Sequence, residues 1–310
     1  MLRSLLTLTL TLTLCLIAPW ARADAPRVAV DIAPVHSLVA QVMEGAGTPD
    51  LILSPGASPH AYALRPSQAA ALQQADMVIW MGAGLTPAME GTIAALSDSA
   101  LVLDLLAHPE TLRLPLRDLA TFEDDDHDHD HDHNHEHGTD GVDPHAWLDP
   151  ENARQWVGLI ADVLSALDPE NAALYTANAE QAQADLTQLT ADLTAILRPA
   201  QSQPYLVFHD AYHYFEDRFG LVPAGAVTGS DATPAGAGRI REITTLAQAK
   251  AIRCALSEPQ FNPRLLEQAL GSGLRIAEID PLGTRHTPGP ALYGATLRDM
   301  AQAIATCTTP

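Results

Sequence analysis

Short apolar segments alternate with segments of helical composition along most of this chain, and that alternation limits the fold more than any other feature. Strands separated by helices of about ten residues form parallel sheets with helices on both faces. The first half and the second half each show four such segments, so we predict two α/β lobes of similar design. The predicted strands are residues 27–32, 50–53, 77–81 and 101–105, followed by 205–209, 222–227, 253–257 and 275–279.

One stretch between the two halves has a different character. Residues 170–198 contain no Gly or Pro, and Leu186, Leu189, Leu193 and Leu197 fall at helical spacing. We predict one long helix over residues 169–199 that joins the lobes as a rigid connector, although an ordinary packed helix has the same pattern. The predicted lobes are residues 24–168 and 200–310.

The first 23 residues form a separate segment. Arg3 precedes an apolar run from Leu5 to Ile17, and the run is followed by the small-x-small sequence from Ala21 to Ala23. This pattern is typical of a secretory signal peptide, so we predict export and cleavage after Ala23. An uncleaved anchor is the alternative, but the apolar run is short for a span of ~20 residues.

A segment with almost no apolar residues interrupts the first lobe. Residues 122–141 read FEDDDHDHDHDHNHEHGTDG, a composition that cannot form a core, so we predict a disordered loop. Imidazole and carboxylate groups are ligands for zinc and similar divalent metals. We predict that this loop binds metal at low affinity, whereas the alternative is a solvated acidic insert. Its histidines are His127, His129, His131, His133, His135 and His137.

The charge of the chain excludes some partners. The formal net charge is −21, and residues 123–140 contribute nine of the acids and no Lys or Arg, so the remainder still carries −12. Such a chain is a poor partner for nucleic acid or for an anionic membrane surface, and it is compatible with cation capture.

Two cysteines remain after removal of the signal peptide. Cys254 and Cys307 are an even pair in an exported chain, which favours a disulfide in an oxidising compartment. The alternative is two separate buried thiols.

Several histidines outside the loop stand where ligands gather in parallel α/β sheets, beyond the carboxyl ends of strands. His60 follows a predicted strand, His209 ends one, and His145 lies in a Pro-flanked segment before a helix. Asp280 stands directly at the end of the last predicted strand, after residue 279. Three imidazoles with one carboxylate or one water form a tetrahedral zinc site. We therefore predict that these four residues converge between the lobes, although each histidine alone is more often a satisfied polar group.

Five motifs give the chain a more specific resemblance. From about Arg27 to its end, the chain resembles the ZnuA-like solute-binding proteins of zinc-uptake ABC transporters, and it carries their motifs in the same order. These motifs are GASPHAYALRPS (56–67), HAWLDP (145–150), FHDAYHYFEDRFGL (208–221), SEPQF (257–261) and IDPLGT (279–284).

The resemblance implies two α/β lobes, one long helix and a metal ion in the interlobe cleft. It also implies a periplasmic monomer that delivers Zn²⁺ to a membrane permease with its ATPase. By motif, the implied ligands are His60, His145 and His209, with Asp280 in the fourth position. Cys254 and Cys307 match a disulfide of the zinc-specific members.

The chain departs from the family pattern at two positions. Pro59 stands where some relatives have an acid, which leaves Asp280 or water as the fourth ligand. His213 stands where a small residue is common, and we expect it to face away from the metal or to line the edge of the cleft. His36, His213 and Glu258 are candidates for residues that surround the ligands.

We therefore predict a zinc-binding receptor and not an enzyme, with the acidic loop as a zinc collector or sensor. A manganese or iron receptor of the same fold is one alternative, but three imidazoles argue against it. An exported zinc hydrolase is another. It would need an open coordination position and a general base, and Glu258 is the one acid in these motifs that could serve.

Overall fold

The computed structural model describes residues 25–97, 99–117, 122, 141–229, 235–261 and 273–309. The predicted signal peptide, the six histidines of the acidic loop and a helix expected at 263–270 lie outside these residues. Among the described residues, no helix combines the length and apolar character needed to cross a membrane.

Both lobes contain a four-stranded, all-parallel sheet, as the alternation predicts. The strand orders are β2-β1-β3-β4 and β6-β5-β7-β8, so the two lobes share one topology. The strands of the first lobe are β1 (Val28–Val30), β2 (Asp50–Leu51), β3 (Met77–Trp80) and β4 (Leu101–Asp104). The strands of the second lobe are β5 (Tyr205–His209), β6 (Pro223–Thr228), β7 (Cys254–Ser257) and β8 (Arg275–Glu278).

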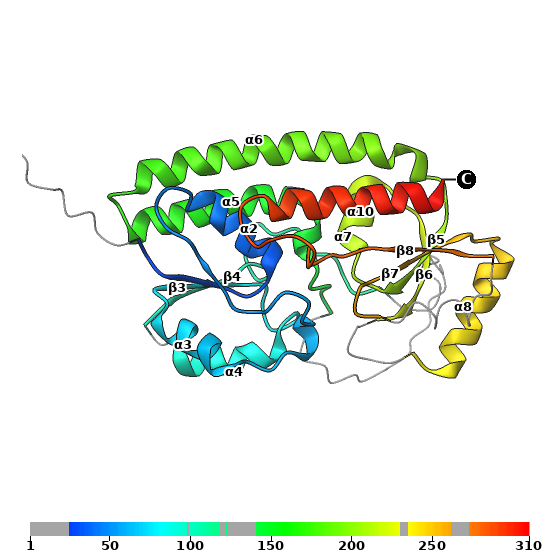
Figure 1. The fold of residues 1–310 in the computed structure, drawn as a ribbon, viewed down its shortest axis with the longest axis horizontal. Coiled ribbons are helices and arrows are strands. Elements are labelled where there is room, and N and C mark those ends of the chain that lie inside the picture. Colours follow the sequence, from blue (N-terminus) through cyan, green and yellow to red (C-terminus); the bar gives the residue numbers. More distant parts are fainter. Residues whose placement is uncertain are drawn as a thin grey trace, which may run out of the picture.

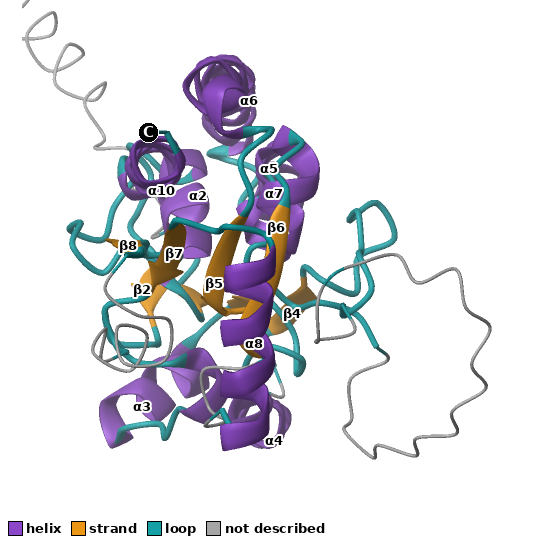
Figure 2. Ribbon diagram, turned by 90° about the vertical axis from the view of Figure 1, so that its right-hand side faces the viewer, coloured by secondary structure: helices purple, strands orange, loops and turns teal. Residues whose placement is uncertain are grey.

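Helices cover both faces of the sheets, as Figures 1 and 2 show. One layer runs along the whole molecule and contains α2, α5, α6 and α10, whereas α3 and α4 cover the other face of the first sheet and α8 lies beside the second. The bounds are α2 (Ala33–Val42), α3 (Pro66–Gln74), α4 (Pro87–Leu96), α5 (Pro150–Leu167), α6 (Ala172–Leu197), α7 (His213–Phe219), α8 (Ala237–Ala249) and α10 (Leu292–Thr308). Short 3₁₀ helices are η1 (Pro59–Ala61), η2 (Ala146–Leu148) and η3 (Arg198–Ala200).

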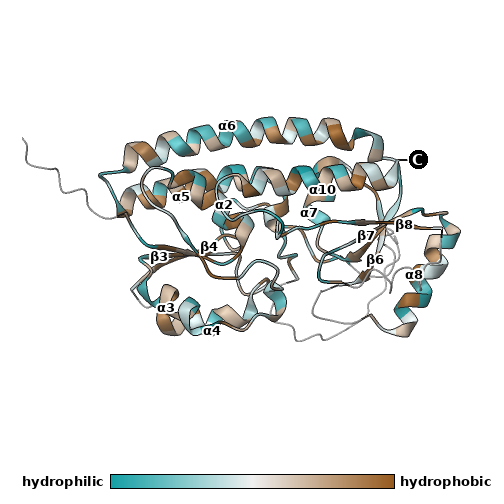
Figure 3. Cartoon of the chain, in the orientation of Figure 1, coloured by the Kyte–Doolittle hydropathy of each residue, from teal (hydrophilic) through white to brown (hydrophobic). Residues whose placement is uncertain are grey.

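The predicted long helix is α6, which has 26 residues and is therefore about 39 Å long. It lies along both lobes (Figure 1) and packs mainly on α5, α10 and α2. Its buried residues recur every three or four positions, which is the period of one helix face. They are Tyr175, Ala179, Ala182, Leu186, Leu189, Leu193 and Leu197. Figure 3 shows the polar colours of its solvent face and the apolar strands below.

The last helix connects the two lobes a second time. α10 packs on β7 and β8 of the second lobe and also on α2 of the first. The Ser37 hydroxyl on α2 donates to the Pro290 carbonyl at 3.0 Å and accepts from the Tyr293 amide at 3.0 Å. The predicted disulfide is confirmed: Cys254 of β7 is bonded to Cys307 of α10. The chain end is thus fixed to a buried strand.

Candidate metal site

Three histidines from distant parts of the sequence meet between the lobes. His60 lies in η1 and His145 lies just before η2, both in the first lobe, whereas His209 is the last residue of β5 in the second. One ligand nitrogen from each lies within 4.8 Å of the other two, and ring centroids are 5.0–5.6 Å apart. In the part of the chain that the structure describes, this is the group of His, Cys and acidic side chains that could hold a metal ion.

The local structure explains how each ring is placed. Pro59 begins η1, and the turn of η1 carries His60. His145 precedes η2, and Asp149 then caps α5 by accepting a hydrogen bond from the Glu151 amide at 2.9 Å. His209 ends β5 at the point where the strand order of the second sheet reverses, the place where parallel α/β sheets bind ligands.

The spacing of the nitrogens fits zinc. The Nε2 atoms of His60 and His145 are 3.3 Å apart. Two nitrogens bound to tetrahedral zinc at ~2.0–2.1 Å are about 3.3 Å apart, so this pair needs little rearrangement to share one ion. His209 is buried and His145 is buried, while His60 is partly exposed and gives the group a side open to solvent.

Buried carboxylates orient two of the three rings. Asp143 accepts from Nδ1 of His145 at 2.7 Å, and Glu258 accepts from Nδ1 of His209 at 3.1 Å. An ionised carboxylate is an acceptor, so the proton of each neutral ring lies on Nδ1, and Nε2 carries the lone pair that could coordinate a metal ion. Burial raises the pKa of Asp143 to about 6, which still leaves the carboxylate ionised at neutral pH.

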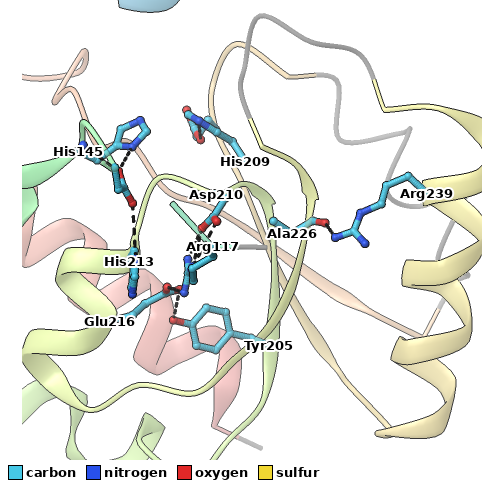
Figure 4. A network of polar contacts seen from close by, with 11 residues as sticks. Arg117, His145, Tyr205, His209, Asp210, His213, Glu216, Ala226 and Arg239 are labelled. Atoms are coloured by element: carbon cyan, nitrogen blue, oxygen red, sulfur yellow. Dashed lines mark hydrogen bonds and ion pairs between the residues drawn. The ribbon is translucent and has the colours of Figure 1, made fainter. Parts of the chain in front are cut away.

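Glu258 and His213 lie next to residues of the ligand group: Glu258 contacts His209, and His213 lies beside Asp143. The Glu258 carboxylate also accepts from the Tyr212 hydroxyl at 3.0 Å. Nδ1 of His213, which Figure 4 labels, lies 3.8 Å from the Asp143 carboxylate. Burial, followed by the charge of Arg117, lowers the pKa of this imidazole.

Two other residues singled out from the sequence, His36 and Asp280, lie outside the group of three histidines. The Nε2 of His36 on α2 contacts the Pro49 carbonyl at 3.0 Å and does not contact the three histidines. Asp280 lies in the loop after β8, where its carboxylate accepts from the Leu282 amide and from the Thr284 amide and hydroxyl at 2.6–3.1 Å. Among the described residues, the histidine group does not include Asp280.

Sequence reasoning missed Asp143 and Arg117. Asp143 stands two residues before His145, and that proximity was the available signal. Arg117 contacts Asp210 and Glu216, which lie more than ninety positions away in the sequence, so the sequence alone gives no sign of these contacts.

Comparisons with known proteins agree on one family. The family model ZnuA, described as zinc-uptake complex component A, periplasmic, matches residues 28–307. The chain is 44% identical over 306 residues to the high-affinity zinc uptake system protein ZnuA of Paracoccus denitrificans, and the match covers 93% of both chains. It is 37% identical to the Brucella abortus protein of the same name, covering 90% of this chain and 91% of that protein.

Solved structures show the same fold. The periplasmic zinc-binding protein TroA from Treponema pallidum is 21% identical to this chain and superposes with a TM-score of 0.77. That match covers 92% of this chain and all of TroA.

Proposed function

The chain belongs to the ZnuA family of periplasmic zinc-uptake components, and from that membership we propose that it captures one Zn²⁺ with His60, His145 and His209. The observation that carries this proposal is the convergence of three ligand nitrogens within 4.8 Å between two lobes. The bound ion is cargo: the protein delivers it to the permease of an ABC importer, which a cytoplasmic ATPase drives. The predicted fold of two parallel-sheet lobes and one long helix is confirmed.

The fourth coordination position is a choice between Asp280 and water. The hydrogen bonds of Asp280 within its own loop do not exhaust the carboxylate, because two oxygens offer about four lone-pair sites. Asp280 therefore stays our predicted fourth ligand, and it would reach the ion from the second lobe. Water would complete the site if the loop keeps its present hydrogen bonds.

The ligand chemistry supports zinc over the alternatives. Manganese and iron(II) receptors are expected to use more oxygen ligands, whereas three imidazoles suit zinc. The contacts of Glu258 argue against the alternative of an exported zinc hydrolase, in which this residue would be the general base. This carboxylate holds Nδ1 of His209 and the hydroxyl of Tyr212, so it orients a ligand and is poorly placed to activate a water. Binding and release, without catalysis, is the function that we propose.

The remaining sequence predictions complete this proposal. The mature protein starts at Asp24 after removal of residues 1–23, acts in the periplasm as a monomer, and consists of lobes 24–168 and 200–310 with the connecting helix 169–199. The six histidines from His127 to His137 collect or sense zinc at lower affinity.

Zinc uptake by cells tests the proposal. In a strain that lacks this protein, uptake of radioactive zinc at scarce external zinc should fall, and the wild-type protein should restore it. His209→Ala should fail to restore uptake because one nitrogen ligand is lost. His286→Ala is the matched control, since His286 pairs with Asp299 at the surface, and it should restore uptake fully. Full restoration by His209→Ala would contradict the proposed site.

A further inference from the structure

The residues that flank the acidic segment on its two sides are paired with each other. The Leu116 amide donates to the Gly141 carbonyl at 2.8 Å, and the Asp143 amide donates to the Leu114 carbonyl at 2.9 Å. Pro115 and Val142 form an antiparallel bridge between them. We call residues 114–117 and 141–143 the neck. Because these hydrogen bonds join its two strands, a displacement of one strand is transmitted to the other.

One strand of the neck holds a ligand. Asp143 is 1% exposed, and its carboxylate accepts from both the amide and the ring Nδ1 of His145, at 2.9 and 2.7 Å. The carbonyl of Asp143 accepts from the Tyr214 hydroxyl on α7 at 2.8 Å. The position of His145 therefore depends on the position of the neck.

The other strand of the neck reaches into the second lobe through Arg117 (Figure 4). Its Nε donates to both Asp210 oxygens at 3.0 and 3.2 Å, and its Nη1 donates to Glu216 at 2.7 Å. Nη2 also contacts Asp210. The Tyr205 hydroxyl of β5 donates to the other oxygen of Glu216 at 2.8 Å. All four side chains are largely buried, with Arg117 14% exposed.

Asp210 directly follows His209, so Arg117 joins the neck that holds His145 to the strand end that holds His209. We propose that Arg117 is a positioning residue that sets the spacing of these two zinc ligands across the lobe boundary. This inference rests on the proposed zinc site. The planar guanidinium group of Arg117 is suited to positioning, since its several N–H donors constrain both the orientation and the distance of the two carboxylates that they bind. A site 1 Å too loose loses much of its affinity.

If Arg117 acted on the site only through its charge, its removal would change the zinc affinity in the opposite direction from loss of a positioning residue. Arg117, Asp210 and Glu216 together carry a net charge of −1 when ionised. Removal of the arginine charge leaves two carboxylates near the site, and Coulomb attraction alone would then bind Zn²⁺ more tightly. A positioning role predicts weaker binding. The direction of the change therefore separates the two explanations.

The test compares three variants of the full mature protein. Arg117→Gln removes the fork, and Arg117→Gln/Glu216→Gln removes it while the cluster keeps a charge of −1. Arg154→Gln is the control, because Arg154 pairs with Glu151 on the surface of α5. Zinc affinity is measured by chelator competition, the Co²⁺ absorption spectrum reports ligand geometry, and thermal unfolding of the zinc-free protein reports the fold.

We expect both Arg117 variants to bind zinc about tenfold more weakly and to show a Co²⁺ spectrum of weaker tetrahedral character. Arg154→Gln should match the wild type in both. Unchanged zinc affinity and spectrum in a folded Arg117 variant would overturn the inference, as would tighter binding by Arg117→Gln. If Arg117→Gln does not fold, the zinc affinity and the Co²⁺ spectrum of the charge-conserving double variant test the inference instead. Failure of the wild type to bind zinc would instead reject the proposed function.

Discussion

Two buried carboxylates, Asp143 and Glu258, determine which nitrogen of His145 and of His209 faces the site. The sequence indicated the three histidines, because His60 and His209 stand near strand ends and His145 stands between prolines. It also indicated Glu258, through its motif. It could not indicate Arg117, since a contact with Asp210 depends on how two lobes meet, and no local pattern encodes that.

A stability prediction concerns His36, whose ring is buried on α2 against the Pro49 carbonyl. Burial lowers the pKa of this imidazole below 6.5, although Pro49 and Asp50 oppose the shift. The His36 imidazole therefore binds a proton more weakly in the folded state than in the unfolded state. The stabilisation is complete above pH 6.5 and is lost as the pH falls below that value.

We expect the zinc-free wild type to lose up to ~1 kcal/mol more unfolding free energy than His36→Gln between pH 7.5 and 5.5. Urea unfolding at both pH values measures the difference, and pH 7.5 is the internal reference, at which the side chain at this position is largely neutral in both proteins. An identical pH dependence in the two proteins would show that His36 is not the group responsible.

At the scale of helices and strands, the apolar pattern predicted the order of elements and missed some of their ends. β5 has the predicted bounds, residues 205–209. The strand expected at 27–32 is shorter, Val28–Val30, and the Asp31 carboxylate just beyond its end accepts from the Ile32 and Met81 amides. α7 begins only at His213, four residues after the end of β5, since the Ala211 amide donates to the His209 carbonyl in a tight turn.

The neck leads to a prediction about the insert. Excision of residues 123–140, with a short Gly-Ser link between Phe122 and Gly141, keeps every hydrogen bond of the neck. The tight zinc site should then keep its affinity, while the number of zinc ions bound per protein falls to one. Calorimetric titration of the full and the excised proteins measures both quantities. A large loss of affinity in the excised protein would show that the insert contributes a ligand to the tight site.

At the scale of the whole molecule, the two lobes, the connecting helix and the disulfide were all predicted, and the packing between the lobes was not. α10 returns to the first lobe, where Ser37 and Tyr293 are hydrogen-bonded. Arg218 of α7 makes two further hydrogen bonds at 2.7 Å to Asp149 of the first lobe. These contacts join surfaces that are far apart in sequence, and apolar periodicity does not specify which surfaces meet.

The most direct test of the account is a zinc titration of the mature protein without residues 123–140, beside the same protein with His60→Ala. We predict one tightly bound zinc ion in the first protein, and binding weaker by on the order of a hundredfold or more in the second, because an imidazole ligand is lost. Equal affinity in the two proteins, or no tight zinc binding in the first, would contradict a zinc site between the lobes.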